Sequence, residues 1–215
     1  MSNYAKADTK AQWFQDNYPG STLELSEDTT VVVLHTTEGF DWPGYEGGAT
    51  APNYTFKPGF APQGGWWRAH FPDERSSRAL RNLSGGVETN TLNAIQVELI
   101  GTCAPVNRNT WYGRKAGEDY VYWPEADDHQ LRDIARFLVD MHQRHGLRLR
   151  APKKFVAYPG SYGSHPERMT FAEWRNATGV VGHQHVPENS HGDPGALNVE
   201  RILHFADRIL KRKDS

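Results

Sequence analysis

The feature that most constrains the fold is a run of β-branched and aliphatic residues, Thr30 to Leu34, that contains no charged side chain. A strand with apolar side chains on both faces must be covered on both sides, which is typical of a central strand in a sheet flanked by other layers. His35 follows the run directly. The sequence therefore predicts a buried central strand with a histidine at its carboxyl end.

Three more segments have strand-like patterns. Residues 93–100 alternate apolar side chains with Gln96 and Glu98, so that the second face carries two polar groups. A short strand is expected at 53–57, within residues 39–65, which are rich in Gly and Pro and are otherwise expected to be irregular, and another strand is expected at 66–71. A charged residue in mid-strand is costly when it is buried without a partner. Glu98 therefore indicates either a solvated sheet face or a functional cleft.

Helical periodicity is confined to other parts of the chain. Residues 128–145 place apolar side chains on one face, begin with acidic residues and are followed by Gly146, which is typical of a helix C-cap. Residues 198–211 are amphipathic and end with basic residues, as the helix dipole favours. A short helix is also expected at 5–16, with Trp13 and Phe14 as its apolar anchors.

Strands early in the chain and helices late predict an α/β fold, a single mixed β-sheet flanked by helices. The 215 residues suit one domain, which we divide into an N-terminal extension at 1–29 and a catalytic core at 30–212.

The net charge of −2 provides no basic field for nucleic acid or an anionic membrane, and apolar runs are too short to cross a bilayer. The N-terminus lacks an apolar signal core, and the single cysteine, Cys103, excludes an internal disulfide.

A cluster of histidines near the C-terminus is the strongest chemical signal. His183, His185, His191 and Asp193 fall within eleven residues, in a stretch too rich in Pro and Gly to form a regular helix. Neutral imidazole and carboxylate groups are ligands that zinc prefers, although a polar surface loop would have the same composition. A second histidine position, His35 at the end of the predicted buried strand, favours a metal site because a rigid scaffold would present it.

Three separated segments resemble the signature segments of the type 2 N-acetylmuramoyl-L-alanine amidases: residues 35–39, 94–101 and 182–195. This family shares its fold with peptidoglycan recognition proteins, phage endolysin amidases and cytosolic anhydro-muropeptide amidases. The resemblance extends from about residue 31 to residue 203, and the three segments occur in the family's order. It implies zinc-dependent hydrolysis of the amide bond between N-acetylmuramic acid and L-alanine in bacterial peptidoglycan.

The resemblance also implies roles for individual residues. His35, His183 and Asp193 match the zinc ligands, with water in the open fourth position of a catalytic site. Glu98 matches the general base. His191 lies where many members carry a lysine that stabilises the oxyanion, so a histidine there departs from the family pattern.

Substrate contacts are expected at four further positions. The segment containing Asn53 and Tyr54 resembles one that carries a catalytic tyrosine in other branches, but with Glu98 present we expect both residues to contact substrate instead. Trp66 and Arg78 are expected to line the groove, by stacking on sugars and by pairing with acidic stem peptides. A core position for Trp66 and its neighbour Trp67 is an equal alternative. His185 is not expected to be a ligand, since the family spacing selects His183.

The expected partner is bacterial peptidoglycan, with no nucleic acid and no membrane, and the chain is expected to be a monomer with Zn²⁺ as its cofactor. Among amidases we favour a phage endolysin that accumulates in the host cytoplasm without a signal peptide and reaches the wall after holin-dependent release. The alternatives are a cytosolic muropeptide-recycling amidase and a peptidoglycan-binding module without catalysis.

Overall fold

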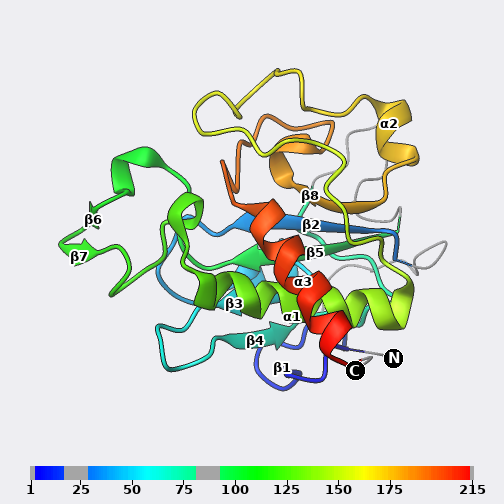
Figure 1. Cartoon of the computed structure of the whole chain (residues 1–215), viewed down its shortest axis with the longest axis horizontal. Coiled ribbons are helices and arrows are strands. Elements are labelled where there is room, and N and C mark those ends of the chain that lie inside the picture. The colour runs from blue at the N-terminus through cyan, green and yellow to red at the C-terminus, as the bar shows by residue number, and fades with distance from the viewer. Residues whose placement is uncertain (1–2, 17–28, 81–92, 214–215) are drawn as a thin grey trace.

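The structure, a computed structural model, describes residues 3–16, 29–80 and 93–213. Within these residues six strands form one mixed sheet in the order β1-β4-β3-β5-β2-β8 (Figure 1). Every neighbouring pair is parallel except β3 with β4. The strands are β1 (Ala7–Asp8), β2 (Val31–Thr36), β3 (Tyr54–Lys57), β4 (Trp66–Ala69), β5 (Ala94–Leu99) and β8 (Gly179–Gly182). The expected α/β fold with a single main mixed sheet is confirmed.

Both long helices predicted from periodicity are present. They are α1 (Asp128–His145) and α3 (Val199–Lys213), and a short helix, α2 (Phe171–Arg175), lies between them in sequence. The Asp127 side chain accepts hydrogen bonds from the first backbone amides of α1, and Gly146 ends the helix in the left-handed conformation with φ 69°. The remaining short elements are the hairpin β6 (Thr110–Trp111) and β7 (Arg114–Lys115) and four 3₁₀ turns, η1 (Tyr45–Gly48), η2 (Pro105–Asn107), η3 (Trp123–Glu125) and η4 (His183–His185).

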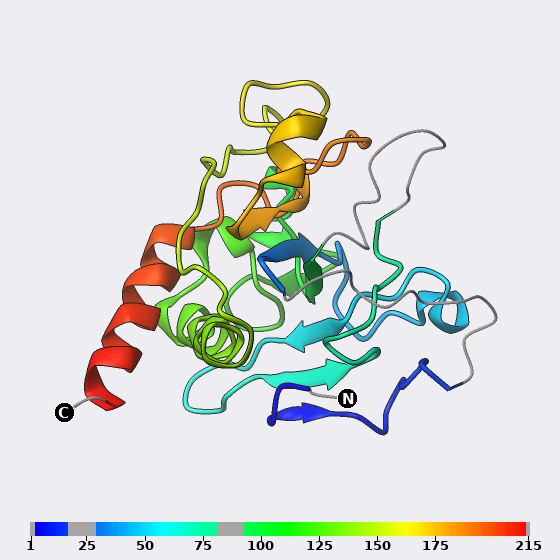
Figure 2. The same ribbon diagram turned by 90° about the vertical axis from the view of Figure 1, so that its right-hand side faces the viewer.

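The two faces of the sheet are covered by different layers. α1 and α3 pack together and cover one face, as the side view shows (Figure 2). On that face lie alternate strand residues such as Leu34, Phe56 and Val97, which are fully buried. The opposite face of β2 carries Val31 and Val33, and these pack against residues that include Met169, Trp174 and Val186. β2 is therefore buried on both faces, as its apolar run predicts.

The N-terminal segment differs from its prediction. Residues 5–16 contain β1 and turns in place of a helix, so that prediction was wrong. The Asp8 carboxylate accepts hydrogen bonds from the backbone amides of Lys10 and Ala11, and such local bonds compete with helix formation. β1 pairs with the edge strand β4, and the Tyr4 ring packs edge-on against Trp67 in the core. The described part of the expected extension is thus integral to the fold, and residues 17–28 lie outside the described residues.

The parallel strands β5, β2 and β8 bring their carboxyl ends to one edge of the sheet. In the register of β2 and β5, His35 lies directly beside Glu98, and Leu34 lies beside Gly182 of β8. Neighbouring strands are about 4.8 Å apart, so residues that follow these strands are close in space although distant in sequence. No helix in the described part of the chain is long and apolar enough to cross a membrane.

Candidate metal centre

Two strands and one loop position the three predicted ligands. His35 is the fifth residue of β2, and His183 follows the last residue of β8. Gly182 is the last residue of that strand, and a Cβ there would come within 2.6 Å of the Pro194 ring. A glycine is therefore required for the loop that carries Asp193 to approach the end of β8 so closely.

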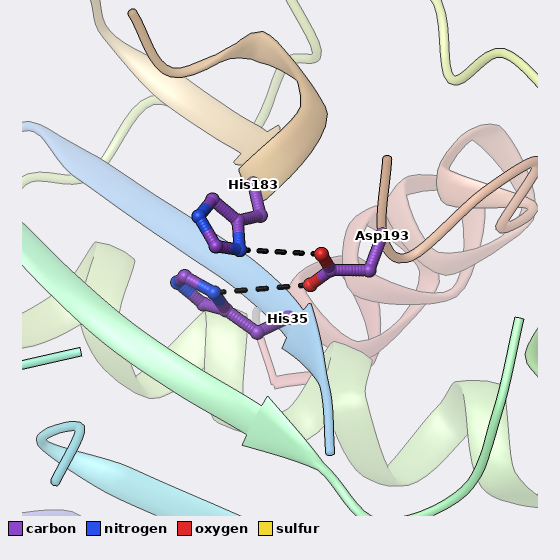
Figure 3. A group of neighbouring side chains, drawn as sticks. All are labelled: His35, His183 and Asp193. Carbon is purple, nitrogen blue, oxygen red and sulfur yellow. Dashed lines mark ion pairs between the residues drawn. The ribbon is translucent and has the colours of Figure 1, made fainter. Parts of the chain in front are cut away.

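The three side chains converge on one point (Figure 3). One ligand atom from each lies within 4.8 Å of the other two, and all three residues are buried. The Asp193 carboxylate faces both imidazoles: its Oδ1 is 3.2 Å from Nδ1 of His183, and its Oδ2 is 3.8 Å from Nδ1 of His35. The backbone amide of Thr36 donates to the same Oδ2 at 3.1 Å. The structure thus brings together the residues that the resemblance implies as ligands.

Two side chains that the sequence did not single out hold this loop in place. The Gln184 amide donates to the carbonyl of Gly195 at 2.8 Å, and its backbone N–H donates to the carbonyl of Asp193 at 2.9 Å. The guanidinium of Arg168 donates to the carbonyls of Val186 and His191 at 2.8 and 2.7 Å. These bonds join segments whose pairing no local sequence pattern indicates, because they depend on how the loop folds back on itself.

Burial and mutual charge set the protonation of the cluster. Burial, reinforced by the neighbouring His183, lowers the pKa of His35 to about 3, so this imidazole is neutral near pH 7. Burial raises the pKa of Asp193, but the His183 and His35 side chains and the Thr36 amide outweigh it and lower the pKa below its ordinary value. The site therefore offers a carboxylate and a neutral imidazole from His35, forms that bind a divalent metal.

Glu98 lies next to the cluster and not on a solvated face. Its Oε1 is 3.9 Å from Nδ1 of His35, and its side chain is only 16% exposed. Its Oε2 is buried and has no hydrogen-bond partner. Burial, and then the charges of Asp193 and Glu38, raise the pKa of the Glu98 carboxyl well above its usual range. An unpartnered buried oxygen beside three potential ligands indicates a place for a group that the protein itself does not supply.

Glu38 is a further carboxylate near this site that the sequence did not single out as functional. It accepts hydrogen bonds from the Thr36 hydroxyl at 2.8 Å, the Thr102 hydroxyl at 2.5 Å and the backbone amide of Cys103 at 2.8 Å. Glu38 therefore joins the end of β2 to the segment that follows β5. The only sequence signal was its place three residues after His35, which does not identify such a contact.

His191 lies over the outer side of the cluster. Its ring stacks on that of His183, with centroids 4.4 Å apart and an interplanar angle of 14°, and its side chain is 62% exposed. Its Nδ1 is 3.7 Å from Oδ1 of Asp193. Burial of part of the ring, and then the His183 side chain, lower the pKa of His191 below its ordinary value. The imidazole is therefore a neutral hydrogen-bond donor at the open side of the site.

His185 has a structural environment, in agreement with its exclusion as a ligand. Its Nδ1 accepts from the backbone amide of Gly182 at 2.9 Å, and its Nε2 contacts the carbonyl of Lys154 at 3.0 Å. Both ring nitrogens are engaged with backbone groups, so neither is available to the group formed by His35, His183 and Asp193.

Two of the expected substrate contacts are corrected by the structure. Tyr54 has no exposed surface, and its hydroxyl bonds to Asp73 and to the backbone amide of Tyr4. Asn53 is equally buried and donates to the carbonyls of Arg75 and Pro72. Neither side chain is accessible to a substrate in this structure. The physical reason for Tyr54 is strand alternation, which turns it toward α1 while Thr55 faces the side of Glu98.

The other two expected contacts are accessible. Trp66 is 55% exposed and lines a cleft of about 460 Å³ with residues that include Trp42, Lys57 and Arg68, whereas Trp67 is buried in the core. Trp67 thus has the core position that was the alternative for this pair, and a role of Trp66 in substrate binding stays a prediction. Arg78 is also exposed, and its role in substrate binding stays a prediction.

Comparison with protein-family models and with curated protein sequences finds no match. Among solved structures, the chain is similar to the hydrolase AmiA of Staphylococcus aureus, crystallised in complex with its ligand. The two chains share 12% sequence identity with a TM-score of 0.48, over 100% of this chain and 82% of that one. A likeness of this extent carries no functional conclusion, so the function proposed below depends on the residues of the site.

Proposed function

We propose that this protein is a zinc-dependent N-acetylmuramoyl-L-alanine amidase that hydrolyses the bond between glycan and stem peptide in bacterial peptidoglycan. The observation that carries the proposal is the convergence of His35, His183 and Asp193 beside Glu98, whose second carboxylate oxygen is buried and unpartnered. These four residues come from the three segments that resemble the amidase signatures. A binding module without catalysis would have no need of a buried carboxyl group at this position.

The donor set fits zinc. Two imidazole nitrogens and one carboxylate oxygen are a ligand set typical of catalytic zinc, in which three protein ligands leave a fourth position open. All three residues are rigidly placed, because His35 lies within a central strand and the loop of Asp193 is bonded back to Gln184. A bound zinc ion supplies Lewis-acid polarisation of the amide carbonyl and lowers the pKa of a water molecule.

The residues of this chain would then handle the protons. Glu98, with its Oε1 3.9 Å from Nδ1 of His35, would accept a proton from the attacking water at a carboxylate oxygen and deliver it to the leaving nitrogen of L-alanine. Because burial raises the pKa of this carboxyl, it holds a proton more readily than an exposed glutamate does, and a group that passes a proton to the leaving nitrogen must first hold it. The neutral His191 would donate a hydrogen bond to the tetrahedral oxyanion from the open side of the site.

We further propose that the substrate is polymeric cell wall, as for a phage endolysin acting after release from the host cytoplasm, and not a small soluble muropeptide. Large aromatic side chains are exposed at several points around the molecule, among them Trp66, Tyr112 and Tyr162, at 55%, 88% and 54%. Exposed aromatic rings suit stacking on successive sugars of a glycan strand. A soluble recycling substrate would require a smaller contact surface.

The experiment is digestion of purified peptidoglycan with zinc-loaded protein, followed by mass analysis of the products. The proposal predicts peptides with a free N-terminal alanine and no new reducing sugar ends. Protein stripped of metal by a chelator should be inactive, and zinc should restore its activity. Reducing ends that rise in step with lysis would show a glycosidase instead, and full activity without metal would refute the metal-dependent mechanism.

A parallel assay separates the two amidase alternatives. Turnover is measured on intact sacculi and on a soluble muropeptide that carries the same stem peptide. An endolysin should act on the polymer with the higher kcat/KM, whereas a recycling enzyme should prefer the soluble fragment. Tight binding to sacculi without any cleavage would support the non-catalytic module.

A further inference from the structure

Gln96 is a fully buried side chain beside the metal site to which the proposed reaction assigns no role. It precedes Glu98 by two residues in β5, and alternation along the strand therefore turns both side chains to the same face. Its Oε1 lies 2.7 Å from Nε2 of His35. This is the distance of a hydrogen bond, and it involves the ring nitrogen that points away from the cluster.

The contact determines which nitrogen of His35 carries the proton. A neutral imidazole has one N–H, and a nitrogen placed against a carbonyl oxygen must be the donor. The other nitrogen, Nδ1, is 3.8 Å from the Asp193 carboxylate and 3.9 Å from that of Glu98, too far to donate a hydrogen bond to either. Its lone pair is therefore left free on the side of the cluster, which is the form a metal requires.

Gln96 is itself held by a second buried amide. Its backbone N–H donates to Oδ1 of Asn53 at 3.0 Å, and the Asn53 amide donates to the carbonyl of Arg75 at 2.9 Å. Since Gln96 and Asn53 are both completely buried, their positions are set by these bonds and by packing. The bonded series runs from the loop after β4, through Asn53 and Gln96, to the imidazole of His35.

We infer that Gln96 is a positioning residue for His35: its side-chain oxygen holds the N–H on Nε2 and thereby directs the Nδ1 lone pair at the metal. The inference rests on the proposed zinc site. It gives a buried polar side chain a purpose, since an amide at this position that served packing alone would be less favourable than an apolar residue. Groups that orient a metal-ligating histidine through its second nitrogen typically contribute 10- to 100-fold to metal affinity.

The test measures zinc affinity by chelator competition for three substitutions at this position. Gln96→Leu removes the acceptor, and Gln96→Asn withdraws it by one methylene while keeping a polar amide; both should bind zinc 10- to 100-fold more weakly. Gln96→Glu retains an oxygen for Nε2 and should lose less than about 10-fold in zinc affinity, below that range. The matched control is Gln130→Leu, which removes another buried glutamine side chain. Gln130 lies on α1, and its side chain donates to the carbonyl of Gly59. It should leave zinc affinity unchanged.

A second measurement does not require metal. In the metal-free protein, long-range ¹H–¹⁵N spectra should show the proton of His35 on Nε2, and in Gln96→Leu both tautomers should be populated. Equal zinc affinity of the parent, Gln96→Leu and Gln96→Asn would overturn the inference, as would a proton found on Nδ1 in the parent. If the parent bound no zinc, the proposed function would fail while the tautomer measurement still decided the role of Gln96. Circular dichroism identifies a variant that has not folded, and Gln96→Asn then provides the result.

Discussion

His70 provides a quantitative test of the fold through its response to pH. It directly follows the last residue of β4 and is fully buried. Its Nδ1 lies 2.9 Å from the carbonyl of Gln12, and its Nε2 lies 2.8 Å from the Thr55 hydroxyl. Nδ1 must donate to the carbonyl, so in the neutral ring Nε2 accepts from Thr55. Burial lowers the pKa of His70 from 6.5 to about 4, an effect that the neighbouring Arg68 reinforces and the Gln12 carbonyl opposes.

The size of the effect follows from linkage. Because the pKa of His70 is lower in the folded protein than in the unfolded chain, the unfolded chain binds the proton more readily. The stability that this site contributes is fully present above pH 6.5 and is lost as the pH falls toward about 4. The difference between these pKa values corresponds to about 3 kcal/mol in total, of which about 2 kcal/mol is lost by pH 5.

The perturbation is His70→Gln, which keeps an acceptor and a donor at this position but does not titrate. Urea unfolding is measured at about pH 7.5 and pH 5 for the parent and the variant. From about pH 7.5 to pH 5 the free energy of unfolding should fall by about 2 kcal/mol more in the parent than in the variant. The contributions of all other titrating groups are common to both proteins and cancel. His204→Gln, an exposed position on α3, is the control and should behave like the parent. Equal losses in parent and His70→Gln, within about 0.5 kcal/mol, would refute the reasoning.

Four substitutions test the site itself. His35→Ala should abolish both zinc binding, expected at about one ion per chain, and turnover, as measured by elemental analysis and peptidoglycan digestion. Glu98→Gln should keep its zinc but lower the turnover rate by roughly 10²- to 10⁴-fold, the usual contribution of a general base. His191→Ala should also keep zinc and lose about 10²-fold in kcat if it stabilises the oxyanion. Tyr54→Phe should leave turnover nearly unchanged but lower the free energy of unfolding by about 1–2 kcal/mol, because the buried Asp73 loses a partner. A dead Tyr54→Phe together with an active Glu98→Gln would reverse the assignment of the base.

The sequence by itself determined the elements whose patterns are local. The apolar run before His35 can be satisfied only by a strand covered on both faces, and β2 has that environment. The 3.6-residue periodicity and the capping residues of 128–145 predict α1 with the bounds it has in the structure. The three residues that converge at the candidate metal site, His35, His183 and Asp193, could likewise be named in advance, because they come from short and specific sequence segments.

The tertiary structure decided which polar side chains share the site. Two adjacent residues in a strand face opposite sides, and the parity of a short strand is set by its register with its neighbours and not by its own composition. This is why Tyr54 lies in the core, while Gln96 and Glu98 both face His35 across the pairing of β5 with β2. The N-terminal segment followed the same rule, since the edge of β4 offered backbone partners that a helix at 5–16 would have left unpaired. The pairing of strands that are distant in sequence therefore determines which of several similar polar side chains lie beside the site.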